Sequence, residues 1–165
     1  MKKEAKKTKS KFKFKIFIIS ILLAYYTGAI GSIFTSTSVK TQWYEAIKPS
    51  ITPSGKFIGT VWNVLFFLIA ISLYLAFTNK SVKTKQRNLL YSLFAINLVL
   101  NGVWSFLFFG LRNTLAGFTE IILLWVSILS LVIYAWRIDK RISYLLIPYL
   151  LWVLFASYIN FLSAF

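Results

Sequence analysis

The chain has 165 residues, 19 basic against only 4 acidic side chains, 58% hydrophobic residues and a mean hydropathy of +0.72. It contains no cysteine and no histidine, which excludes disulfides, thiolate or imidazole metal sites and histidine general bases. So few acids make catalysis by a pair of carboxylates very improbable, and the sequence contains no conventional set of catalytic residues. The apolar residues come in runs of about twenty, the length that crosses a bilayer, so the sequence predicts an integral membrane protein.

The first part of the chain is a basic tail, residues 1–13. The stretch MKKEAKKTKSKFKFK holds eight lysines directly before and at the start of the first apolar run. Lysine-rich segments beside a membrane span mark the cytoplasmic face and meet anionic lipid headgroups. We therefore interpret the charge as a membrane signal and expect no nucleic-acid partner.

Residues 14–165 are expected to form one all-α domain, a five-transmembrane-helix bundle. Five segments are uncharged or nearly so, and helices are the natural way for them to satisfy their backbone groups in lipid. The expected spans cover about residues 14–35, 57–78, 88–110, 114–136 and 143–165.

Charge predicts the orientation of the bundle. With the N-terminus inside, the tail and the linkers 79–87 and 137–142 place fifteen of the nineteen basic residues on the inner side. This asymmetry predicts a cytoplasmic N-terminus and an outside C-terminus. The linker 36–56 is then a long outer loop with two prolines and a tryptophan, and loops of this length often act as lids.

Tryptophans and amides gather in the outer half of three spans. Trp62 lies in the outer third of the second span, and polar and aromatic residues follow one helical face in each of the third and fifth. Polar groups in hydrocarbon are costly unless they face protein or a cavity, so these faces predict walls of a pocket beneath the loop. The two faces are Asn97, Asn101, Trp104 and Phe108, and Tyr149, Trp152, Ala156 and Asn160.

Other interpretations of the same residues stay open. Asparagines inside bundles often only bond neighbouring helices, and deep tryptophans often only pack. Glu120, the single acid within an expected span, is read as a bonded structural acid or as a proton-coupling residue. Three hypotheses follow: a binding protein for a flat apolar ligand, a small transporter that uses Glu120, and a structural scaffold.

Six segments, in order, resemble the TspO/MBR family of tryptophan-rich sensory proteins, which includes the translocator protein or peripheral benzodiazepine receptor. They are GAIGSIFTS, WYEAIKPS, GTVWN, NLVLNGVWSFLFFG, LAGFTEIILLW and IPYLLWVLFASYIN. The resemblance implies a multi-pass protein, here of a prokaryotic cell membrane, that is often a homodimer. It implies a pocket for porphyrins and for isoquinoline- or benzodiazepine-type ligands, closed by the loop 36–56.

Positions that match the family's motifs assign pocket residues to this chain. The resemblance implies Trp62 and Trp152 as pocket tryptophans and Trp43 on the lid. It also implies the helix-three asparagines Asn97 and Asn101 and the small residues Ala156 and Ser157, while Trp104 and Tyr149 join them by facing alone.

The expected function is that of a receptor or sensor that binds a porphyrin such as protoporphyrin IX or haem as its ligand, without a cofactor or metal. Breakdown of protoporphyrin in light and oxygen, with Trp62 and Trp152 as the redox-active indoles, and transport of the ligand are the alternatives. Lys48 and Lys56 are candidates to pair with porphyrin propionates, on charge and position alone.

Overall fold

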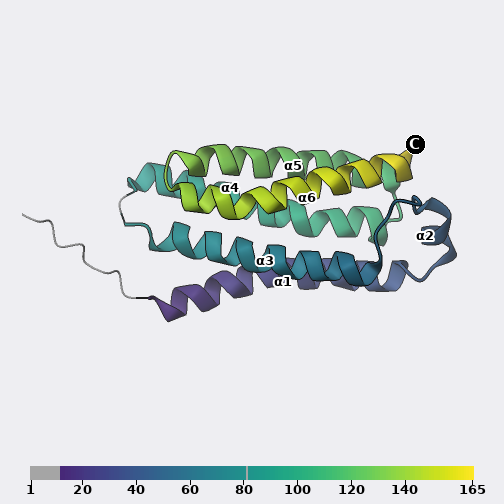
Figure 1. Cartoon of the computed structure of the whole chain (residues 1–165), viewed down its shortest axis with the longest axis horizontal. Coiled ribbons are helices and arrows are strands. Elements are labelled where there is room, and N and C mark those ends of the chain that lie inside the picture. The colour runs from purple at the N-terminus through teal and green to yellow at the C-terminus, as the bar shows by residue number, and fades with distance from the viewer. Residues whose placement is uncertain (1–11, 81) are drawn as a thin grey trace, which may run out of the picture.

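The computed structural model describes residues 12–80 and 82–165, and these residues form helices joined by short turns (Figure 1). The basic tail falls almost entirely outside the described residues. The long helices are α1 Phe14–Ser38, α3 Gly55–Thr78, α4 Thr84–Ser105, α5 Thr114–Trp136 and α6 Lys140–Ala164. A short helix, α2 Gln42–Ile47, lies in the loop after α1, and a π-helical turn, η1 Phe106–Gly110, extends α4.

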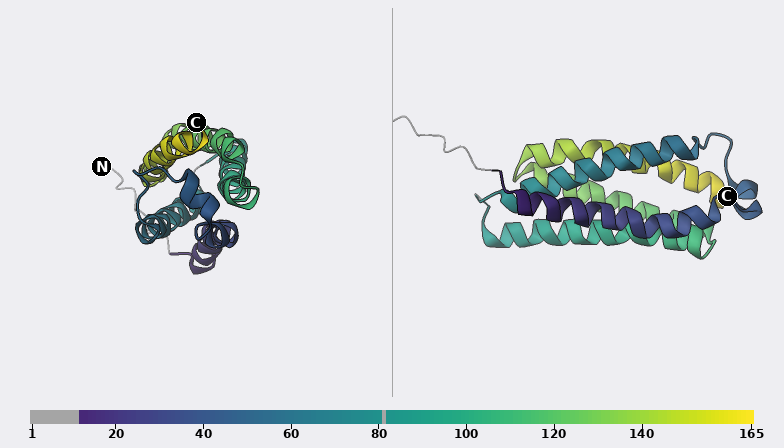
Figure 2. Two further views of the ribbon diagram at one scale, coloured as in Figure 1. Left: turned by 90° about the vertical axis from the view of Figure 1, so that its right-hand side faces the viewer. Right: turned by 90° about the horizontal axis from the view of Figure 1, so that it is seen from below.

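The five long helices form a closed ring. Each packs against two neighbours, in the order α1, α3, α6, α5, α4 and back to α1. Seen along the bundle, α2 lies across one end of the ring (Figure 2). We call this end the lid end. The helices α4 and α6 are thus not neighbours in the ring, although both pack on α5.

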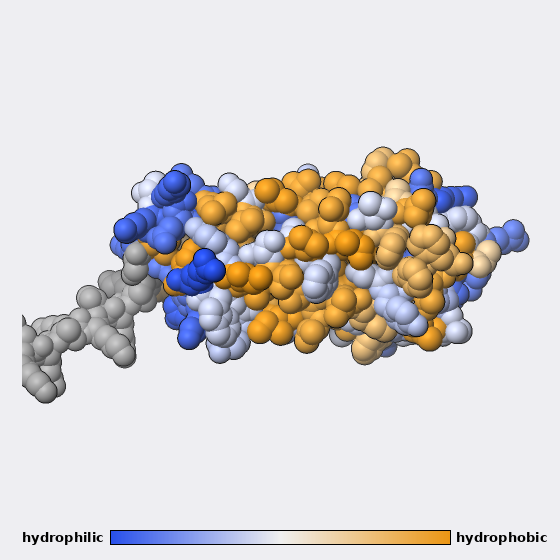
Figure 3. Space-filling view, turned by 90° about the horizontal axis from the view of Figure 1, so that it is seen from above, coloured by the Kyte–Doolittle hydropathy of each residue, from blue (hydrophilic) through white to orange (hydrophobic). Residues whose placement is uncertain are grey.

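The surface of the bundle is that of a membrane protein. A broad apolar belt covers its middle, and hydrophilic residues collect toward the two ends (Figure 3). Within residues 12–80 and 82–165, five helices are long and apolar enough to cross a membrane, with α4 and η1 together making one of them. Large apolar side chains such as Leu22, Val99 and Leu151 are about 60% exposed on the outer faces of the helices, as lipid contact requires. The predicted fold class, an all-α bundle with five spans, is confirmed, while its inside–outside orientation stays a prediction.

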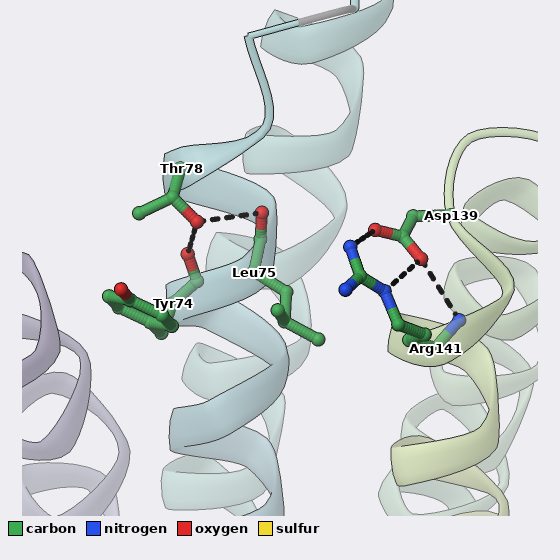
Figure 4. Close-up of polar contacts among 5 residues, drawn as sticks. All are labelled: Tyr74, Leu75, Thr78, Asp139 and Arg141. Atoms are coloured by element: carbon green, nitrogen blue, oxygen red, sulfur yellow. Dashed lines mark hydrogen bonds and ion pairs between the residues drawn. The ribbon is translucent and has the colours of Figure 1, made fainter. Parts of the chain in front are cut away.

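At the end of the bundle opposite the lid, local hydrogen bonds stabilise the ends of the helices. The hydroxyl of Thr78 donates to the carbonyl of Tyr74 at 2.7 Å in the last turn of α3 (Figure 4). Asp139 is the N-cap of α6, where its Oδ1 accepts a hydrogen bond from the backbone N–H of Arg141 at 3.1 Å. Two further bonds join the Asp139 carboxylate to the Arg141 guanidinium, at 3.0 and 2.8 Å. This pair fixes the turn between α5 and α6.

The π-helical turn η1 holds the loop 36–56, which we call the lid, against the bundle. It buries two successive side chains, Phe108 and Phe109. The hydroxyl of Ser38, at the end of α1, donates to the carbonyl of Phe109 at 3.0 Å. The rings of Trp43 and Tyr44 in α2 pack on Phe108 and Phe109, with centroid distances of 5.9 and 5.7 Å. The lid is therefore held against α4 and not only by its own ends.

Candidate ligand-binding cavity

A cavity of about 1000 Å³ occupies the lid half of the ring. Its walls come from all five long helices, from η1 and from the segment 44–55 that closes the lid end. Ligand pockets typically span about 300–1,000 Å³, so this cavity lies at the upper end of the range and can accept a flat polycyclic molecule.

Indole and phenyl rings line much of the wall. Trp62 of α3 stacks on Phe66 at a centroid distance of 5.4 Å and an interplanar angle of 28°. Trp152 of α6 lies 6.2 Å from the ring of Phe57 and 5.6 Å from that of Phe155. Trp62 and Trp152 therefore border the cavity from two neighbouring helices, each supported by aromatic rings, and such faces suit a ligand with its own π system.

Two hydrogen bonds cross the interior of the ring from α4 to α6. The amide of Asn101 donates to the hydroxyl of Tyr149 at 2.9 Å, and the indole of Trp104 donates to Oδ1 of Asn160 at 3.1 Å. The Asn160 amide in turn donates to the carbonyl of Ala156 at 2.9 Å. These pairs satisfy polar groups deep in the bundle and leave their cavity-facing surfaces mainly apolar.

The cavity brings together five of the nine residues that the sequence suggested for a ligand site. The other four lie nearby without lining it. Trp43 contacts Phe108 on one side and the guanidinium of Arg112 on the other, at 5.9 Å in each case. The five that line the cavity are Trp62, Asn101, Trp104, Trp152 and Ala156.

Asn97, Tyr149 and Ser157 lie in the core of the bundle instead. Asn97 is 1% exposed and donates to the hydroxyl of Ser127 at 2.8 Å, which ties α4 to α5. Tyr149 is fully buried, and Trp62 meets its ring edge-on at 6.1 Å. The hydroxyl of Ser157 returns to the carbonyl of Val153 at 2.8 Å. For Asn97 the helix-bonding interpretation therefore describes the contact that the structure contains.

Several cavity residues were not among the sequence-based candidates. Gly28 and Gly31 of α1 line the wall and let α1 approach Phe66 of α3 and Ser105 of α4. The lid contributes Tyr44 and Thr52. Glycines three residues apart in a membrane helix are a sequence signal for close packing, but nothing in the pattern of the loop indicated which of its side chains turn inward.

Glu120 does not behave as a bonded structural acid. It is 5% exposed, and neither carboxylate oxygen has a hydrogen-bond partner among the residues that the structure describes. It borders a second, shallower cavity between η1 and α5, beside Leu107 and Thr119. That expectation is therefore wrong, because the polar side chains near Glu120 bond elsewhere: Asn113 caps α5 through the N–H of Ala116, and Thr119 bonds the carbonyl of Leu115.

The ring of five spans, with an aromatic cavity under a short lid helix, defines a multi-pass helical membrane protein with an internal site. The chain belongs to the TspO/MBR family, whose family model matches residues 20–164. It is 42% identical to the tryptophan-rich protein TspO of Archaeoglobus fulgidus over 145 residues, which cover 87% of this chain and 92% of that protein.

Further relatives come from bacteria and animals. The tryptophan-rich protein TspO of Chlorobaculum tepidum is 38% identical over 143 residues, covering 87% of this chain and 90% of the relative. The human translocator protein is 26% identical over 121 residues, covering 73% of this chain and 72% of the relative. These relatives and the five apolar helices identify an integral, multi-pass membrane protein.

Proposed function

We propose that this protein is a membrane receptor or sensor that binds a porphyrin-type tetrapyrrole in the cavity under the 36–56 loop. The observation that carries the proposal is the pairing of Trp62 and Trp152 on the wall of a cavity of about 1000 Å³ that lies within an apolar bundle. A flat macrocycle presents two apolar faces, and offset or edge-on ring contacts with indoles stabilise such faces beyond simple burial. Smaller flat ligands of the isoquinoline or benzodiazepine type suit the same walls.

The name of one relative agrees with a sensing role, since the protein from Cereibacter sphaeroides is named a tryptophan-rich sensory protein. The human relative is named a translocator protein, which agrees with the alternative of transport. The porphyrin, as protoporphyrin IX or haem, acts in this proposal as the ligand and not as a resident cofactor. We also propose a homodimer, which chemical cross-linking in nanodiscs would test.

The test is a titration with protoporphyrin IX in the dark, followed by tryptophan emission, in nanodiscs with empty nanodiscs as the blank. The parent protein should show saturable quenching. The double variant Trp62→Phe/Trp152→Phe should bind about tenfold more weakly, because two indole contacts of about 0.5–1.5 kcal/mol each are reduced. A matched control is Trp136→Phe, since Trp136 lies at the opposite end of the bundle beside Lys140 and is 41% exposed.

Equal quenching of the parent and the double variant would refute the proposed site. The same samples under illumination test the alternative of light-dependent breakdown, in which the porphyrin absorbance would decline only with intact Trp62 and Trp152. Transport is the second candidate function, and the buried Glu120, which has no hydrogen-bond partner in the part of the chain that the structure describes, favours it. A transporter that uses this carboxyl should lose uptake in Glu120→Gln and keep its dark porphyrin affinity.

A further inference from the structure

The polar groups of the cavity differ in whether they already have a partner. Asn101, Trp104 and Asn160 are engaged in the bonds that cross the ring. By contrast, the hydroxyl of Thr52 in the loop and the indole Nε1 of Trp152 on α6 are buried and have no partner within the described residues. Both residues line the cavity. An indole N–H can only donate, so a ligand atom placed here must be an acceptor.

The lid end of the cavity holds a cation whose present partner is easily replaced. Lys48 lines the cavity, and its ammonium lies 3.0 Å from both carboxylate oxygens of Glu45, three residues earlier. The Glu45 side chain is 61% exposed and that of Lys48 35%. Exposed ion pairs of this kind contribute little to stability, because water screens both charges. Lys48 can therefore exchange Glu45 for another carboxylate at little cost.

Tyr44 completes the polar end of the cavity. Its ring packs on Phe109 and lies 5.8 Å from the Lys48 ammonium. Burial, the largest effect, raises the pKa of the Tyr44 hydroxyl above its ordinary value, so the phenol stays protonated at neutral pH. Close to Lys48 the cavity thus offers donors: an ammonium, a phenol and the hydroxyl of Thr52.

We propose that Lys48, assisted by Thr52, forms a carboxylate-binding subsite at the lid end of the cavity, which Glu45 occupies when no ligand is bound. The inference rests on the proposed porphyrin function and specifies its ligand class: a flat apolar body that carries a free carboxylate at one edge. The apolar body lies between the tryptophans, and its carboxylate displaces Glu45 from Lys48. Hydrogen bonds to an ionised group are about twice as strong as neutral ones, so this edge sets the orientation of the ligand.

The test compares protoporphyrin IX with its dimethyl ester, which keeps the macrocycle and removes both negative charges. Lys48→Gln should weaken binding of the free acid about tenfold and leave the ester unchanged. Glu45→Gln should strengthen binding of the free acid severalfold, because it removes the competing carboxylate, and again leave the ester unchanged. Lys56→Gln is the matched control, since Lys56 is an exposed lysine in the first turn of α3, at the same end of the bundle, and does not line the cavity.

The outcomes separate this subsite from the proposed function. If Lys48→Gln and Glu45→Gln change the affinities for acid and ester alike, or if Lys56→Gln reproduces the loss, the subsite is refuted while cavity binding stands. If the parent binds neither compound saturably, the proposed function fails and the subsite fails with it. Opposite shifts for the two lid variants, confined to the free acid, establish the subsite.

Discussion

Trp104 and Asn160 join two helices that are not neighbours in the ring, through a hydrogen bond of 3.1 Å from the indole Nε1 to the amide oxygen. The bond crosses the interior beside the cavity, which both residues line. Asn160 is 3% exposed, so its oxygen has no ready access to water if the indole is removed. The pair thus has a structural role in addition to any contact with a ligand.

Trp104→Phe is expected to lower the free energy of unfolding by about 1–2 kcal/mol, because it leaves a buried amide oxygen without a donor. Hydrogen bonds between membrane helices average about 0.6 kcal/mol, with a maximum near 1.7. A double-mutant cycle with Asn160→Ala, measured by reversible SDS unfolding in mixed micelles, gives the coupling energy. Additive effects of the two substitutions would show that the bond contributes nothing to stability.

Removal of the hydroxyl that takes part in the second bond across the ring, from Asn101 to Tyr149, is expected to lower the stability of the protein. Tyr149→Phe should keep the ring contact with Trp62 and lower the free energy of unfolding by about 1 kcal/mol, since the Asn101 amide loses its acceptor. Tyr158→Phe is the control, because Tyr158 is 55% exposed on the lipid side of the same helix. Equal melting temperatures of the two variants would contradict the prediction.

Spacing along the chain could indicate which faces of the helices turn inward, but not which groups meet. The stripes through Asn101 and Trp104 on α4, and through Trp152 and Ala156 on α6, do line the cavity. Periodicity sets direction within one helix, whereas partners depend on the order of helices in the ring and on their axial register. Tyr149 shows the difference, because it shares a stripe with Trp152 but is closed off from the cavity by its place in the core.

The sequence could predict that the lid is a loop, but not how that loop folds. A helix of six residues such as α2 has no stability of its own, so its formation depends on packing against η1. The π-helical turn itself has no sequence signal of the kind that caps and prolines provide. Trp43 lies in α2 within the expected loop, while its contacts with Phe108 and Arg112 emerge only from the folded chain.

Two glycines predict opposite outcomes for the same substitution. An added methyl at Gly117 of α5 would lie 2.6 Å from Cδ2 of Phe108, so Gly117→Ala should displace the π-helical turn and lower the free energy of unfolding by about 1–3 kcal/mol. At Gly59 of α3 an added methyl meets nothing within 4 Å. Gly59→Ala should leave stability unchanged or raise it by up to about 1 kcal/mol. Thermal melts of both variants in one detergent check the contrast, and a tolerated Gly117→Ala would disprove it.

Replacing Glu120 by an apolar residue is expected to stabilise the folded protein. Its carboxyl lies almost fully buried in a membrane helix, without a partner among the described residues. Replacing a buried, unpaired polar group by an apolar one of similar size removes its desolvation penalty, so Glu120→Leu should raise the free energy of unfolding by about 1–3 kcal/mol. Unfolding in mixed micelles measures the change. A less stable variant would mean that the carboxyl does bond within the folded protein.

The turn between α5 and α6 predicts a dependence of local stability on pH. The hydrogen bond from the Arg141 guanidinium, the largest effect, holds the pKa of Asp139 below its ordinary value in the folded protein. A folded-state pKa below the unfolded value of about 3.9 makes the carboxylate stabilising above that value. This contribution is lost as the pH falls through the lower, folded-state pKa. Amide exchange at residues 138–143 should therefore accelerate on acidification below about pH 4.

Two substitutions divide the roles of Asp139. Asp139→Asn retains a good N-cap for α6 but cannot ionise, so amide exchange should be faster than in the parent at neutral pH and should lose the acid-dependent step. Asp139→Ala removes the cap as well and should cost about 0.5–2 kcal/mol of helix stability at every pH. An acid-dependent step that persists in Asp139→Asn would assign the titration to another group. Absence of the acid-dependent step in Asp139→Asn would show that the bonds between Asp139 and Arg141 in Figure 4 are the pH-sensitive contacts that stabilise this turn.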